Sequence, residues 1–167
     1  METNNFDAIG YFRDMAEKNK LAKKNGFIAT VISNIDNIEG LMDEFRNTDR
    51  FIAISDTSSG NLSSLDGTYG FSCNRAFTVF ILSGYEFGDM ESREKELDLC
   101  REIFHQFVSR IIHDKYEYNG LQTFFDTTSF PNQELGRHFL NGVTGLHFTV
   151  YMRTPKDLEY DSSQWED

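Results

Sequence analysis

Cysteine, proline and long apolar runs are all scarce in this 167-residue sequence. Its two cysteines, Cys73 and Cys100, form no CxxC pair, which argues against a disulfide framework and predicts reduced thiols in an intracellular protein. Two prolines leave no proline-rich linker. No apolar stretch reaches membrane-spanning length, and residues 1–5 lack the features of a signal peptide. The sequence therefore predicts a protein that folds in a cytoplasm.

Positive charge is scarce as well. The sequence has 16 Lys and Arg residues against 27 Asp and Glu, for a formal net charge of −11. This balance argues against a surface that binds nucleic-acid phosphates or an anionic membrane. The charge is uneven, because cations gather in residues 13–24 and anions in residues 155–167. The pattern is consistent with attraction between these segments, within one chain or between copies, and equally with two separate solvated surfaces.

Aromatic residues are plentiful, with 16 Phe and 7 Tyr, and they supply much of a core for one domain. Helical spacing of apolar residues predicts two main helices, residues 7–24 and 89–115, and a brief one capped at Asp36 or Asn37 and running through Phe45. Apolar or alternating runs predict six strands, at residues 27–32, 50–55, 76–83, 123–130, 135–140 and 146–153. The Ser- and Gly-rich residues 56–70 are interpreted as an exposed loop or hairpin tip.

The last predicted strand carries the clearest pattern. Apolar side chains alternate strictly with polar ones from Leu146 to Arg153, which is typical of an antiparallel strand with one buried face. Gly142 and Gly145 are interpreted as forming the turn into it, and Pro155 as its end. The fold class is therefore α+β: a mostly antiparallel sheet with a long helix and an N-terminal helix packed on it. Residues 1–155 form the single domain, and residues 156–167 an acidic C-terminal extension.

No catalytic or metal-binding set can be assembled from the sequence. Glu102 and His105 share one helical face, but the partners of a di-iron site are missing, so a surface pair is the favoured interpretation. Residues 56–61 lack the Gly-Lys-Ser/Thr ending of a phosphate-binding loop. No Ser, Thr or Cys lies in a nucleophile context. We therefore expect no enzyme activity, cofactor or metal; a hydrolase using the Glu102–His105 face is kept as a lesser hypothesis.

The order of these elements resembles the tail-terminator and head–tail connector proteins of tailed bacteriophages. These are small, acidic, single-domain α+β proteins with an N-terminal helix, an antiparallel sheet and a long helix packed against it. The matching features are the opening helix, the apolar strand at 77–83 that leads into the helix at 89–115, and the segment Gly142–Val150 before a short polar tail. A ring or adaptor protein in the tail of a short-tailed phage matches equally well.

This resemblance implies a structural virion protein without catalytic residues. Its copies form a homo-oligomeric ring at the head–tail junction or tail end, next to adjacent tail or connector proteins. DNA passes through the negatively charged lumen without specific binding. Such a protein is made in the host cytoplasm and ends in the tail or neck of the virion. The expected interface combines the two charged segments, with these residues: Tyr160, Asp161, Trp165, Lys20, Lys23 and Lys24.

A second hypothesis is a binding protein that is not part of a virion. An acidic cytoplasmic binding module, or an immunity-type protein, masks a basic partner with its negative surface. Its association rate would fall as salt is added, because salt screens electrostatic steering.

Overall fold

The computed structural model describes residues 6–33, 50–64, 70–117, 124–136 and 142–166. In these ranges the chain forms a six-stranded sheet with order β1-β2-β3-β6-β4, and β5 pairs with β6 beside that path. β1 (Phe27–Ile32) runs parallel to β2 (Arg50–Ser64), and the other pairs are antiparallel: β2 with β3 (Phe71–Gly84), and β6 (Val143–Lys156) with β3, β4 (Phe124–Asp126) and β5 (Asn132–Glu134). The predicted α+β class is confirmed.

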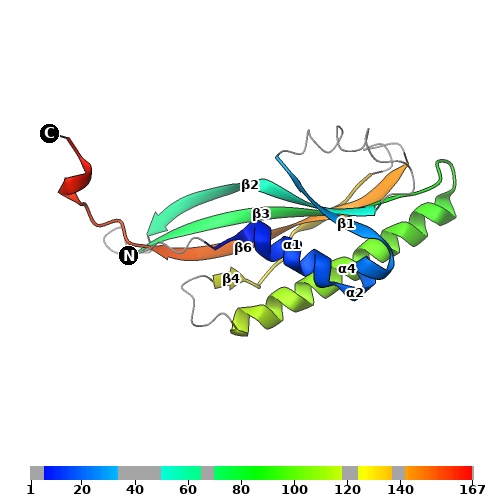
Figure 1. Ribbon diagram of the computed structural model, residues 1–167, viewed down its shortest axis with the longest axis horizontal. Coiled ribbons are helices and arrows are strands. Elements are labelled where there is room, and N and C mark those ends of the chain that lie inside the picture. Colours follow the sequence, from blue (N-terminus) through cyan, green and yellow to red (C-terminus); the bar gives the residue numbers. More distant parts are fainter. Residues whose placement is uncertain (1–5, 34–49, 65–69, 118–123, 137–141, 167) are drawn as a thin grey trace.

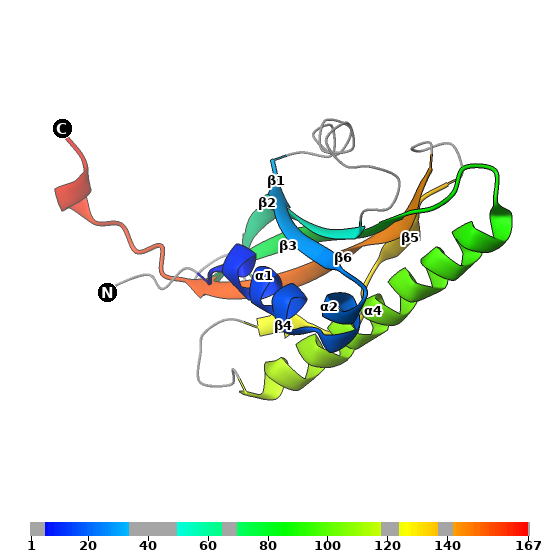
Figure 2. The same ribbon diagram turned by 45° about the vertical axis from the view of Figure 1, so that its right-hand side comes forward.

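The helices cover one face of this sheet. α1 (Ala8–Lys18) and α2 (Lys20–Lys24) precede β1, while the long α4 (Met90–Glu117) follows β3 and lies diagonally across the sheet (Figures 1 and 2). Asp89 begins α4 by accepting hydrogen bonds from the backbone N–H groups of Glu91 and Ser92, the usual task of an N-terminal cap. The sequence prediction of two main helices on one side of an antiparallel sheet is therefore correct.

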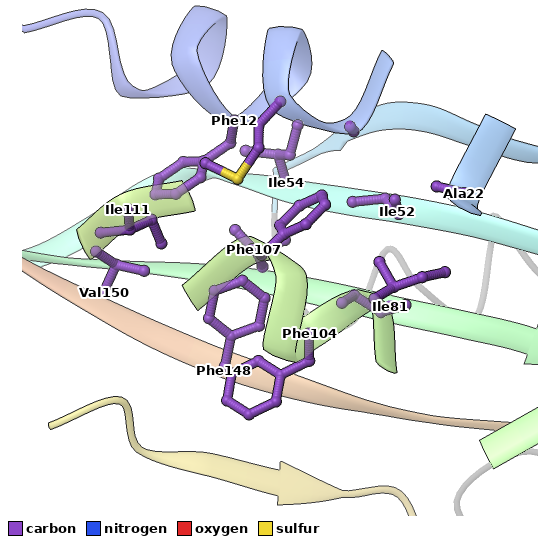
Figure 3. Close-up of a cluster of buried hydrophobic side chains, with 14 of the residues drawn as sticks. Phe12, Ala22, Ile52, Ile54, Ile81, Phe104, Phe107, Ile111, Phe148 and Val150 are labelled. Carbon is purple, nitrogen blue, oxygen red and sulfur yellow. The ribbon is translucent and has the colours of Figure 1, made fainter. Parts of the chain in front are cut away.

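The main core lies between the helices and the sheet. Phe107 of α4 is fully buried and meets Phe148 of β6 edge to face, with ring centroids 6.3 Å apart. Figure 3 shows Phe12 of α1 entering this cluster from the other helix. Burial of each such side chain contributes about 1.5–3 kcal/mol relative to exposure. The alternation predicted from Leu146 to Arg153 is confirmed, because its apolar members are buried in this core and the polar ones are not.

A second, smaller cluster is buried on the opposite face of the sheet. β3 supplies Phe80 and Leu82 to it, while Val79 and Ile81 of the same strand enter the main core. The strand is thus buried on both faces, as its continuous apolar run predicts. β2 contributes Phe51 to the second cluster in the same alternating way.

The sequence prediction of one helix over residues 7–24 is wrong at Asn19. This residue has an extended backbone, with φ −67° and ψ 116°, and separates α1 from α2. Its backbone N–H closes α1 on Met15, while its side-chain oxygen caps α2 by accepting from the N–H of Ala22. Asn competes well for such caps, so the break needs no glycine or proline. The predicted end of the helical segment at Asn25 and Gly26 is confirmed, because α2 ends at Lys24 and Gly26 adopts a left-handed φ of 74°.

Several strand predictions also need correction. β2 continues through Ser64 and pairs with β3, so of the two alternatives given for residues 56–70 the hairpin, and not the loop, describes residues 56–64. β4 covers only three residues of the predicted strand at 123–130, and β5 ends at Glu134, before the strand predicted at 135–140. α4 continues through Tyr116 and Glu117, two residues beyond the end predicted at residue 115. The brief helix predicted from Asp36 or Asn37 to Phe45 lies outside the described residues, as does most of the segment at 135–140.

Gly145 and Pro155 both lie inside β6, so the turn predicted to include Gly145 and the end predicted at Pro155 are wrong. Gly145 sits where β6 approaches β3 so closely that a Cβ would lie 2.1 Å from the carbonyl oxygen of Ile81. Pro155 is tolerated because β4 pairs only as far as Arg153. Among the described residues none pairs with that edge of β6 beyond Arg153, so a missing N–H facing it costs none of the described ladder bonds.

β2, β3 and β6 continue together beyond the helical layer as a three-stranded arm (Figure 1). A β-bulge in β2 lies before this arm, because the pairing with β3 shifts between Ile54 and Ser58. β1 ends at the same place, with Ile32 opposite Ser55. Bulges bend a strand and increase its twist. The covered part of the sheet continues past the bulge, since Phe77 of β3 packs against the main core and Met152 of β6 is buried in it.

Candidate interaction surfaces

The C-terminal extension, residues 157–166, leads away from the end of the arm (Figures 1 and 2). It ends in a 3-10 turn, η2 (Ser162–Gln164), with Tyr160 and Trp165 on either side. Their rings stack with centroids 6.4 Å apart and planes 24° apart, yet the two residues remain 70% and 67% exposed. Two large aromatic side chains held together in solvent are typical of an interface anchor.

Asp161 shapes this turn. One carboxylate oxygen accepts hydrogen bonds from the backbone N–H and the hydroxyl of Ser163, and the other accepts from the amide of Gln164. The hydrogen bonds from Ser163 lower the pKa of Asp161 below its ordinary value, so the carboxylate keeps its charge. The residue predicted as an interface anion thus also stabilises the turn that separates Tyr160 from Trp165.

The predicted cations lie on α2. Lys20, Lys23 and Lys24 are exposed, and among the described residues no carboxylate forms an ion pair with any of them. Lys18 differs, since its ammonium lies 2.7 Å from Asp14. α2 is fixed to the long helix by Asn19, whose side-chain amide donates to Gln106 of α4 at 3.0 Å. The three lysines therefore form a supported, positively charged surface, here called the α2 lysines.

The α2 lysines and the extension lie far apart within one chain. Phe27 follows α2 and pairs with Arg50 of β2. Arg50 pairs with Ser83 of β3, and Ser83 pairs with Thr144 of β6, so Phe27 and Thr144 lie at the same level along the strands. Thr144 precedes Lys156 by twelve residues of strand, which span roughly 40 Å. Tyr160 lies only four residues beyond Lys156 and can reach about 14 Å from it. Tyr160 and Asp161 therefore cannot meet Lys23 or Lys24 of the same chain.

A groove of about 320 Å³ runs between α1 and α4, next to the α2 lysines. Its apolar floor includes Met15 and Phe107, and Lys20 stands at its rim. The two carboxylates of its lining, Asp14 and Asp114, are both paired. Asp114 accepts from the guanidinium of Arg110 and the hydroxyl of Tyr11. Burial alone favours the protonated acid, but these hydrogen bonds outweigh it and lower the pKa of Asp114.

A second concave surface lies on the sheet face opposite the helices and is rich in hydroxyl groups. His147 of β6 lies beside it, its ring 5.4 Å from that of Phe80. Among the described residues the buried Nδ1 atom of His147 has no hydrogen-bond partner, and burial lowers the pKa of the ring. Sequence alternation placed His147 on this face, but only the structure shows the neighbouring hydroxyl side chains: Ser55, Thr57, Ser59, Thr78 and Thr149.

The candidate chemistry considered from the sequence is not assembled. Glu102 and His105 are both exposed on the outer side of α4. Glu102 accepts a hydrogen bond from the side-chain amide of Gln106. Within the described ranges, no three His, Cys, Asp or Glu residues gather in a way that could hold a metal ion. Residues 56–61 belong to β2, and Ser58 to Asn61 pair with β3. None of the helices in the described part of the chain is long and apolar enough to cross a membrane.

Both cysteines are free thiols, as the sequence predicts. Cys100 is buried in the main core, and this burial raises the pKa of its thiol to about 12. A thiol with so high a pKa is a poor nucleophile at neutral pH. Cys100 is thus a core residue.

No protein-family model matches this chain, and no curated protein matches it.

Proposed function

We propose that this protein is a structural virion protein that forms a ring at the head–tail junction or tail end of a tailed phage. Copies contact one another head to tail, with the acidic extension of one copy meeting the α2 lysines of the next. One observation carries the proposal: cations without an ion-pair partner among the described residues, and exposed carboxylates, lie on one chain at positions that cannot meet within that chain. Contacts of this heterologous type close into rings when the rotation between copies permits.

The element order supports the proposal, because an N-terminal helix, an antiparallel sheet and a long helix packed on it are what the resemblance to tail-terminator and connector proteins implies. The projecting arm and its extension provide surface for contacts with neighbouring copies and with adjacent tail or connector proteins. The net charge of −11 suits a lumen through which DNA passes without being bound. The role requires no catalytic residue or cofactor, and places the protein in the host cytoplasm during assembly and then in the tail or neck.

A charge exchange tests this proposal. One variant carries glutamates in place of the α2 lysines, and a second carries lysines at positions 157, 159 and 161. Each should fail to assemble alone, since like charges then face one another, and the two mixed should associate through the inverted pair at one interface. A lysine-to-glutamate change at Lys95, an exposed residue of α4, is the control. Unchanged assembly of the first two variants would count against the proposal.

The acidic binding module remains the second candidate, favoured by the exposed start of α4. Glu91, Glu94 and Asp98 lie along one exposed region there. Such a surface suits a basic protein partner. The genes beside this one discriminate between the candidates: portal, terminase and tail genes favour the ring protein, whereas a toxin gene favours the binding module.

A further inference from the structure

We infer that the groove between α1 and α4 is the docking site for Tyr160 and Trp165 from a second copy of this chain. The inference rests on the proposed head-to-tail assembly. It names the residues that each of the two copies contributes to their contact. The groove is defined by six residues that carry the argument: Tyr11, Met15, Lys18, Lys20, Phe107 and Arg110.

The groove has the size and floor for aromatic side chains. Its volume of about 320 Å³ is roughly twice that of an apolar cavity that accommodates benzene. Met15 and Phe107 lie beneath the groove and are themselves buried. Tyr160 and Trp165 bury little area on their own chain, so docking would remove their exposed aromatic surface from water.

The charges of the two surfaces are complementary. Asp14 and Asp114 in the groove are already paired with Lys18 and Arg110, which leaves Lys20 as the lining cation with no ion-pair partner among the described residues. The extension brings a carboxylate next to each aromatic ring, Asp161 after Tyr160 and Glu166 after Trp165. A cation at the rim can also lie over the face of an indole ring.

The extension of the same chain leads away from the helices, so the proposed occupant of the groove is another copy (Figures 1 and 2). Asn19 is hydrogen-bonded to Gln106, whose neighbour Phe107 packs on Phe148. Phe148 precedes Lys156 by eight residues of β6, or roughly 26 Å of strand. Tyr160 can reach only about 14 Å beyond Lys156, and Trp165 is stacked on it. The end of β6 therefore lies away from Lys20, and Tyr160 and Trp165 of the same chain remain exposed and do not fill the groove in this structure.

Trp165 is the only tryptophan of the chain, so its emission reports the docking directly. On assembly of the full-length protein, the emission should shift to the blue and quenching by acrylamide should fall. Trp165→Ala should weaken assembly by at least about thirtyfold, the loss expected when an interface anchor is removed. Lys20→Glu should weaken assembly as well, whereas Lys95→Glu should not.

Cross-linking in mixtures identifies the docking site and the donor of the aromatic pair. A Lys20→Cys chain mixed with a Gln164→Cys chain should give disulfide-linked dimers, and a Lys95→Cys chain mixed with the same partner should not. A chain carrying both Lys20→Cys and Gln164→Cys should link between molecules and therefore in a concentration-dependent way. Links formed within single molecules at high dilution would overturn the inference.

The remaining outcomes separate this inference from the proposed function. If the chain assembles while Trp165 keeps the emission and quenching of an exposed indole, the inferred docking site is wrong, but the proposed ring-forming function is retained. If the chain never assembles, alone or with neighbouring components, both are wrong.

Discussion

Arg50, the first residue of β2, forms a two-point ion pair with Glu96 of α4. Its Nε donates to Oε2 at 2.9 Å and its Nη2 to Oε1 at 2.7 Å. Ser83 of β3 also donates to Glu96, and the second Nη of Arg50 donates to the carbonyl of Asn25. These bonds join α4, two strands and the segment after α2. The pair therefore fixes the positions of the α2 lysines and the groove relative to the sheet.

Removing the charge of Glu96 should destabilise the protein. Glu96→Gln keeps the shape of the side chain but leaves the guanidinium of Arg50 partly buried with a weakened partner. We expect a loss of roughly 2–3 kcal/mol in the free energy of unfolding, measured by urea denaturation. Glu134→Gln is the matched control, because its pair with Arg101 is more exposed and should contribute less than about 1 kcal/mol. Equal losses in the two variants would contradict this role.

The same residue predicts how stability changes in acid. Burial by itself raises the pKa of Glu96, but the hydrogen bonds from Arg50 and Ser83 outweigh it and the net pKa lies below the ordinary 4.5. The unfolded chain therefore binds a proton first as the pH falls. Stability from this group is complete above about pH 4.5 and is lost as the pH falls through the lower folded value. Urea midpoints between pH 6 and pH 3 should fall more steeply for the parent than for Glu96→Gln.

Gly145 should not tolerate a side chain. Its φ of 142° and the contact that a Cβ would make with the carbonyl of Ile81 both oppose alanine. Gly145→Ala should cost about 3 kcal/mol or more in the free energy of unfolding. Gly136→Ala is the control, because nothing lies within 4 Å of its added Cβ and its φ is not in the left-handed region. A Gly145→Ala protein as stable as the control would show that β6 and β3 can move apart.

Sequence periodicity predicted those elements in which one local pattern dominates. The alternation around Phe148 and the double-sided burial of Val79 to Leu82 follow directly from side-chain character. The break at Asn19 was missed because the apolar stripe continues across it while the asparagine side chain caps the second helix. Gly145 was assigned to a turn, since a sequence does not show how closely another backbone approaches.

Only some residues of the candidate site could be predicted from the sequence. The charge segregation identified Lys20 and Asp161, and the isolated aromatic residues identified Trp165. The groove was missed because it depends on side chains from α1 and α4 that are about ninety positions apart, such as Met15 and Phe107. The distance that separates the two charged segments also needed the strand register, which no local pattern specifies.

Deletion of residues 157–167 should change assembly and leave stability nearly unchanged. In the described part of the extension every side chain is exposed, and Tyr160 and Trp165 pack on one another and not on the sheet. We expect the free energy of unfolding to stay within about 0.5 kcal/mol of the parent, as for surface changes in general. Thermal melting and size-exclusion chromatography of both chains check the two effects. A truncated chain that melts well below the parent and still assembles would make the extension part of the core.

The mass of the full-length protein in solution tests the central claim most directly. Light scattering should be recorded on the purified chain over a range of concentrations, alone and mixed with the proteins encoded beside it. Head-to-tail rings predict one discrete mass that is a whole multiple of the 19.3 kDa chain, or a complex of fixed stoichiometry with a neighbouring component. A mass of one chain at every concentration, with no complex in any mixture, would contradict the ring.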